Sequence, residues 1–131
     1  MALRKRIAIV DGIRTPFIKA NGILKAMEAD DLGAYAVKEL LARINIDPNE
    51  VDELIFGNVL QPPHVTNIAR VISVKGGLPE SVPAFTVNRN CSSGMEAVVT
   101  AANKIELDQA DIIIAGGVES MSNFPILVSK A

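Results

Sequence analysis

Short apolar runs rich in β-branched residues alternate along this chain with longer segments of helical periodicity. The candidate strands are Arg6–Val10, Glu53–Gly57, Ala84–Asn88 and Asp111–Ala115. The candidate helices run from Asp30 or Asp31 to about Ile44, from Asn67 to Val74 and from Cys91 to about Leu107, with one helical turn after Asp47-Pro48. Strands that alternate with helices in this way predict an α/β fold with a mainly parallel sheet and helices on its faces.

Local signals set the expected ends and buried faces of these elements. Asp30 or Asp31 is the expected cap of the first helix, and Gly76-Gly77 ends the second. Gly116-Gly117 is expected to close the last strand with a turn. Helical spacing predicts that the first helix faces the core with Leu32, Tyr35, Ala36, Leu40 and Ile44. The third helix is expected to bury Met95, Val98, Val99, Ala102 and Ile105.

Length, composition and charge exclude several classes of protein. The 131 residues are enough for one domain with a real core. An apolar fraction of 49% with 21% charged residues excludes a disordered chain. The net charge of −2, with Lys and Arg spread along the sequence, gives no electrostatic reason to expect nucleic acid as a partner.

Cysteine content and hydropathy bear on the compartment. The single cysteine excludes an internal disulfide and fits a reducing setting. The apolar run Ile7–Val10 is too short for the core of a signal peptide, and no stretch is long enough to cross a bilayer. We therefore expect a cytoplasmic protein with no membrane span and no metal site.

The most informative local segment surrounds the cysteine. Asn88–Ala97 joins a candidate buried strand to a helix, which places Cys91 at or just before the helix start. Backbone N–H groups and the helix dipole there favour a thiolate and can stabilise the oxyanion of an acyl-transfer intermediate. Ser92 and Ser93 are expected to cap the helix, and Gly94 leaves room for a substrate or another chain segment.

A plainer interpretation of Cys91 is also open. On spacing alone, a lone cysteine is more often a small buried apolar residue. A cysteine nucleophile normally needs a nearby base, and the only histidine is His64, in a Pro-Pro-His-Val loop typical of exposed residues.

Several motifs together resemble the thiolase family. Val87–Val98 resembles the segment around the acyl-accepting cysteine of thiolases, and Ala115–Ser122 is similar to the second family signature. Arg14–Phe17, Gly57–Val59 and Asn67–Arg70 match the regions before and between them. The motifs follow the family order over nearly the whole chain. Asn67–Arg70 and the tail Phe124–Lys130 also resemble the thiolase subunit of trifunctional fatty-acid oxidation complexes, whereas the cysteine segment is closer to general thiolases.

The resemblance implies a fold and a reaction. Cys91 would take an acyl group from a 3-ketoacyl-CoA and release acetyl-CoA, and a second coenzyme A would carry the acyl group away, or the reverse. It implies acyl-CoA and coenzyme A as substrates, no tightly bound cofactor, a homo-oligomer and a hydratase/dehydrogenase subunit as a candidate partner. Residues 1–131 would form the amino-terminal thiolase domain, with a mixed sheet but without its fifth strand. The carboxy-terminal half, which carries the base histidine and a second cysteine, would also be absent.

The resemblance also assigns supporting roles. The residues expected to shape the site are Asn88, Ser92, Gly94, Gly116, Gly117 and Glu119. Met121 is expected to pack, and Arg89 to face solvent, a partner or a substrate. Two alternatives stay open: a related ketoacyl synthase or hydroxymethylglutaryl-CoA synthase, and a non-catalytic fragment or interaction module. The Asn-Arg-Asn before Cys91 and the segment Gly116–Ser122 favour a thiolase.

Overall fold

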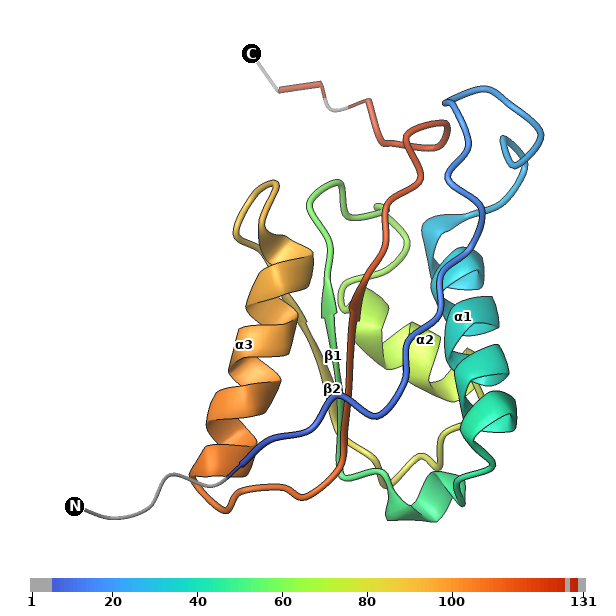
Figure 1. Ribbon diagram of the computed structural model, residues 1–131. Helices are drawn as coiled ribbons and strands as arrows, with labels where there is room; N and C mark the ends of the chain where they lie inside the picture. The colour runs from blue at the N-terminus through green and yellow to red at the C-terminus, as the bar shows by residue number, and fades with distance from the viewer. Residues whose placement is uncertain (1–5, 127, 130–131) are drawn as a thin grey trace.

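Three parallel strands and three α-helices form the described part of the chain. The computed structural model describes residues 6–126, 128 and 129; two tail positions named above, Leu127 and Lys130, lie outside it. The elements follow the order α1 (Ala29–Ile44), η1 (Pro48–Glu50), β1 (Glu53–Gly57), α2 (Ile68–Lys75), β2 (Ala84–Val87), α3 (Ser93–Glu106) and β3 (Ile113–Gly117) (Figure 1). The sheet has the order β2-β1-β3, and both strand pairs are parallel.

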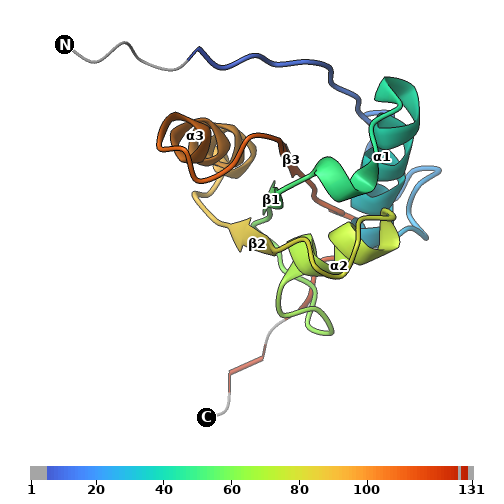
Figure 2. The same ribbon diagram turned by 90° about the horizontal axis from the view of Figure 1, so that it is seen from below.

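The helices cover the sheet on both faces. Figure 2 shows α1 and α2 together on one side and α3 on the other. Every residue of β1 is buried because it is the central strand. Its side chains alternate between two cores: Leu54 and Phe56 join the larger one under α1 and α2, and Ile55 joins the smaller one under α3. This α/β architecture confirms the predicted fold class.

The prediction that Arg6–Val10 forms a strand is wrong. Residues 6–10 lie outside the sheet and are exposed, with Ile9 at 85% and Val10 at 83%. A β-branched composition favours a strand only where the segment meets a partner, and residues 6–10 pair with none of the three strands. It runs extended across the molecule toward α1 (Figure 1), and Asp11 forms an ion pair with Arg43 at 3.0 Å.

The buried faces of α1 and α3 also differ from the expectation. Helix α3 buries Ser93, Ala97 and Ala101, whereas Met95 is 66% exposed and Val99 45%. Helix α1 buries Gly33, Ala34, Val37 and Leu41. Of the predicted set, Leu32, Ala36, Leu40 and Ile44 are half-buried, and Tyr35 is 61% exposed. Small residues face inward because the elements approach closely: a Cβ added to Gly33 would lie 2.5 Å from Cδ1 of Ile72.

Most of the predicted turns and helix ends hold. The Asp47 side chain caps η1 by accepting from the Asn49 N–H, and the Asn67 side chain caps α2 by accepting from the Arg70 N–H. Gly77, with φ 95°, follows the end of α2 as expected. Helix α1 departs from the prediction, because its N-cap residue is Glu28, not Asp30 or Asp31.

The carboxylate of Asp52, just before β1, joins this strand to the segment before β3. Asp52 accepts hydrogen bonds from the N–H groups of Asp111 and Ile112 at 2.7 and 2.9 Å, and these donors, that of Ile112 first, lower the pKa of Asp52. The contact aligns the start of β1 with the start of β3.

Among residues 6–126, 128 and 129, no helix is long and apolar enough to cross a membrane.

Candidate active site

Glycines bring the first turn of α3 directly onto the carboxyl ends of β1 and β3. A Cβ added to Gly57 would lie 2.4 Å from the carbonyl carbon of Ser93 and 2.6 Å from the nitrogen of Gly94. A Cβ added to Gly117 would lie 3.2 Å from the Cα of Gly94. Backbone atoms this close to an added Cβ exclude a side chain at Gly57. The glycines therefore fix where α3 begins relative to the sheet.

The glycine pair after the last candidate strand has a different role from the one expected. Gly116 and Gly117 lie inside β3 and do not close it with a turn. A Cβ added to Gly116 would lie 2.7 Å from the ring of Phe56 on the neighbouring strand. These positions lack side chains because packing against Phe56 and against Gly94 leaves no space.

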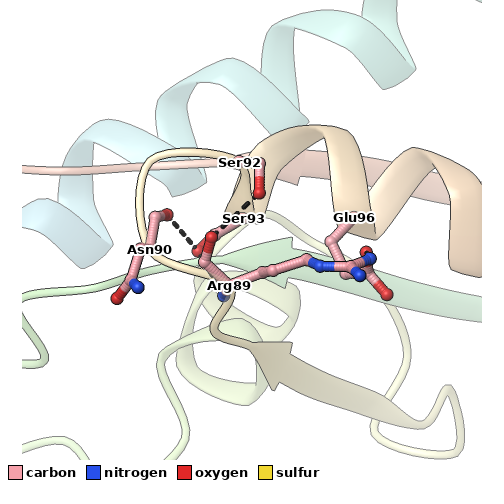
Figure 3. A network of polar contacts seen from close by, with 5 residues as sticks. All are labelled: Arg89, Asn90, Ser92, Ser93 and Glu96. Atoms are coloured by element: carbon pink, nitrogen blue, oxygen red, sulfur yellow. Dashed lines mark hydrogen bonds and ion pairs between the residues drawn. The ribbon is translucent and has the colours of Figure 1, made fainter.

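A hydrogen-bonded turn carries Cys91 between β2 and α3 (Figure 3). The Ser93 Oγ accepts from the Arg89 N–H at 2.8 Å and donates to the Asn90 carbonyl at 2.6 Å. The Ser92 hydroxyl donates to the Arg89 carbonyl at 2.9 Å. Ser92 occupies the N-cap position of α3, but its side chain makes no cap hydrogen bond, so the expected capping role is wrong. Cys91 itself is exposed, two residues before the helix.

Two asparagines shape the same turn. Asn90 has a φ of 50°, in the left-handed region that asparagine adopts more readily than most residues. The Asn88 Oδ1 accepts from the Asn90 N–H at 3.0 Å, an arrangement that stabilises tight turns. The predicted supporting residue Asn88 thus holds the backbone immediately before Cys91.

A groove of about 910 Å³ opens beside the cysteine. Its walls come from the extended segment 11–20, from α1, from the carboxyl ends of β1 and β3, and from residues 118–122. The predicted site residues that line the groove are Cys91, Gly94, Gly116, Gly117 and Glu119. Asn88 and Ser92 lie in the cysteine turn outside this lining. A Cβ added to Gly94 would meet nothing within 4 Å, so the space above the helix start is open.

Glu119 ties two walls of the groove together. Its carboxylate accepts from the Asn58 side-chain amide at 2.8 Å and from the N–H groups of Val59 and Leu60 at 3.1 and 2.8 Å. The Asn58 amide also donates to the Val118 carbonyl at 2.9 Å, and Asn58 is buried. The sequence alone does not assign Asn58 to the site, although Asn58 belongs to the Gly57–Val59 motif that matches the family.

Other polar or thioether candidates lie apart from the cysteine or differ from expectation. His64 is exposed in its loop and is not part of the groove lining. Met121 lines the groove and is 54% exposed, so it is not a core residue of the described chain. Arg89 forms an ion pair with Glu96 in the first turn of α3 (Figure 3). In the described part of the chain, no group of His, Cys, Asp and Glu side chains is arranged to hold a metal ion.

Fold and site together define a class of protein: an α/β domain that presents an exposed cysteine from a strand–helix turn at the carboxyl end of a parallel sheet. Known proteins match this chain closely. The family described as thiolase, N-terminal domain, matches residues 7–131. A probable acetyl-CoA acyltransferase of Staphylococcus epidermidis is 43% identical over 126 residues, which are 96% of this chain and 32% of that protein. A relative with the same description from Staphylococcus aureus is 42% identical over the same shares.

Two solved structures share the fold. The Bacillus anthracis acetyl-CoA acetyltransferase superimposes with a TM-score of 0.81 at 36% identity, over 85% of this chain and 28% of that one. The Acat5 thiolase from Ascaris suum, in complex with coenzyme A, gives 0.87 at 37% identity, over 91% and 31%. The chain belongs to the thiolase family and corresponds to its amino-terminal domain. It spans about a third of the length of the curated relatives, at 32%.

Proposed function

We propose that this chain supplies the acyl-accepting nucleophile of a thiolase and that Cys91 is that nucleophile. The observation that carries the proposal is the position of Cys91: exposed, beside a groove, and two residues before a helix. The thiolate is the reactive form of cysteine, and an exposed sulfur beside a groove can reach a substrate bound there. Membership of the thiolase family supports this role over a ketoacyl synthase or a hydroxymethylglutaryl-CoA synthase, and over a non-catalytic module.

The proposed reaction is the thiolytic cleavage of a 3-ketoacyl-CoA, or its reverse. The Cys91 sulfur attacks the 3-keto carbon, and the bond between carbons 2 and 3 then breaks. The acetyl-CoA carbanion takes up a proton, and the shortened acyl group stays on the sulfur as a thioester. The thiol of a second coenzyme A attacks that thioester, loses its proton and leaves as acyl-CoA while Cys91 is released.

Coenzyme A and its acyl thioesters are the substrates in this proposal, and no tightly bound cofactor takes part. The Ascaris suum thiolase of the same fold was solved in complex with coenzyme A, which supports the assignment. The described groove contains no histidine and one cysteine, so we propose that the base and the second acid/base group come from a longer or complementing polypeptide. We further propose that the complete enzyme is a cytoplasmic homo-oligomer with a hydratase/dehydrogenase subunit as its partner.

The test is an acetyl-CoA release assay with a 3-ketoacyl-CoA and coenzyme A. We expect no turnover above background for the 131-residue chain alone. Loss of a general base alone typically costs about 10²–10⁴-fold, and groups that act as a unit lose activity together. Adding a carboxy-terminal thiolase half should produce turnover that Cys91→Ala abolishes. Turnover that survives Cys91→Ala would exclude Cys91 as the nucleophile.

A further inference from the structure

The turn that carries Cys91 depends on one buried hydroxyl. Ser93 is 4% exposed, and its Oγ accepts from the Arg89 N–H while donating to the Asn90 carbonyl. A serine hydroxyl has one proton to donate, and Ser93 uses both that proton and an acceptor lone pair within the same turn (Figure 3). The two residues that it holds are the two immediately before the cysteine.

The main chain of Ser93 is fixed at the same time by the sheet. Its carbonyl group sits where any side chain on Gly57 would collide, since an added Cβ would be 2.4 Å from the carbonyl carbon. The residue thus links β1, through its backbone, to the turn, through its side chain. Asn90 occupies the left-handed region, which costs free energy for a residue with a Cβ. The Ser93 hydroxyl bonds to the Arg89 N–H, just before Asn90, and to the Asn90 carbonyl. These two hydrogen bonds offset the conformational free energy that Asn90 costs.

No other described serine near the site combines these features. Ser92 is exposed, and its hydroxyl makes one hydrogen bond to the turn, at 2.9 Å to the Arg89 carbonyl. Ser73 is equally buried, at 0% exposure, yet its Oγ has no hydrogen-bond partner within the described part of the chain. Burial of a serine in this fold therefore does not by itself create a network.

We propose that Ser93 is a positioning residue for acyl transfer: its hydroxyl fixes the backbone that presents the Cys91 sulfur to the groove. The inference rests on the proposed role of Cys91 as nucleophile. Ser93 acts through the turn, by holding Arg89 and Asn90. Reactive groups must be held closely to keep their reactivity, because a displacement of about 1 Å can cost 10²-fold in rate.

The test measures the reaction of Cys91 with iodoacetamide in the 131-residue chain, folded in buffer and unfolded in guanidinium chloride. The ratio of the two rate constants reports what the folded turn adds. We expect Ser93→Ala to lower this ratio about tenfold, and Ser93→Thr, which keeps the hydroxyl, to restore it to within about twofold. An unchanged ratio in Ser93→Ala would overturn the inference.

Two matched variants separate positioning from general destabilisation. Ser73→Ala removes a buried hydroxyl that has no partner, and Ile72→Val weakens the core on the opposite face of the sheet. Both should keep the wild-type ratio. A comparable fall in either would assign the Ser93→Ala effect to loss of stability and would count against positioning.

A second measurement covers the case in which the threonine variant does not fold. The Arg89 amide loses its acceptor in Ser93→Ala, so its hydrogen exchange should accelerate relative to the Leu54 amide of β1, which donates to Pro83. Unchanged protection of Arg89 would contradict the proposal. The proposed function has a separate test, because turnover that survives Cys91→Ala would overturn it. That result does not depend on the alkylation ratio of the Ser93 variants.

Discussion

At the scale of single residues, the site depends on side chains that are missing as much as on those that are present. Gly57 in β1 and Gly117 in β3 let the backbone of α3 reach the sheet at Ser93 and Gly94. The cysteine turn is therefore held by two contacts: the start of α3 packs on β1 and β3, and the Ser93 hydroxyl bonds to Arg89 and Asn90. Cys91 is exposed on this hydrogen-bonded turn.

Gly57→Ala should be the most disruptive small substitution near the site. The added methyl group would meet backbone atoms of Ser93 and Gly94 at 2.4–2.6 Å, and backbone atoms cannot rotate away. We expect the free energy of unfolding to fall by about 1–3 kcal/mol, measured by urea denaturation followed by circular dichroism. Gly12→Ala is the control, because a Cβ there would meet nothing within 4 Å. Equal stability of the two variants would contradict the close contact.

Glu119 shows how one side chain can act over a long sequence separation. Its three hydrogen-bond donors belong to residues 58–60, about sixty positions earlier in the chain. The carboxylate connects the loop after β1 to the segment after β3, so both walls of the groove keep a fixed spacing. Its role here is to hold backbone, in line with the structural role expected for it.

At the scale of elements, helix packing is governed by small residues. Helix α3 places Ala97 and Ala101 on the sheet, and α1 places Gly33 against Ile72 of α2. The larger apolar residues of α3, among them Met95 and Val99, consequently point away from the sheet. An ion-paired cluster completes the contact between α1 and α2: Lys75 at the end of α2 reaches Asp30 at 2.6 Å and Asp31 at 2.7 Å.

Lys75→Met should weaken the packing of α1 on α2. Asp30 is 3% exposed and would lose its counter-charge. We expect a loss of about 1–2 kcal/mol in unfolding free energy, below the value for a fully buried pair because the Lys75 side chain is 45% exposed. Lys38→Met, an exposed change in α1, is the control; a loss of the same size there would contradict the prediction.

The same contact predicts a dependence on alkaline pH. The hydrogen bonds to Asp30 and then Asp31 raise the pKa of Lys75 above its ordinary value of 10.5. A raised pKa in the folded state means that the pair contributes fully below pH 10.5 and is lost as the pH rises through the higher folded value. In urea denaturation at pH values above 10.5, the free energy of unfolding should fall more steeply with pH in the wild type than in Lys75→Met.

At the scale of the whole molecule, apolar side chains remain exposed on more than one surface. The outer face of α3 carries Met95, Val98 and Val99, and Phe17 in the amino-terminal segment is 94% exposed. Exposed patches of this kind favour association. We expect light scattering to give a dimer or larger species for the isolated chain. Val99→Lys should shift the distribution toward monomer, and a monomeric wild type at high concentration would contradict the prediction.

The sequence by itself determined the features that depend on neighbouring residues. The alternation of strands and helices, the cap at Asp47, the glycine end of α2 and the position of Cys91 before a helix follow from local composition, and the motifs indicate the family. Propensity, capping and turn chemistry act over a few residues, so a single sequence carries them in full.

Only the tertiary structure decided which candidate elements pair and which faces meet. Residues 6–10 have the composition of a strand but pair with none of the three strands and lie outside the sheet. Hydrophobic periodicity predicted the larger apolar residues as the inner face of α3, whereas close approach selected Ala97 and Ala101. The contacts of Glu119 with residues 58–60 join segments that no local pattern connects. Strand pairing and packing depend on residues far apart in the chain, and their free energy exists only once those segments meet.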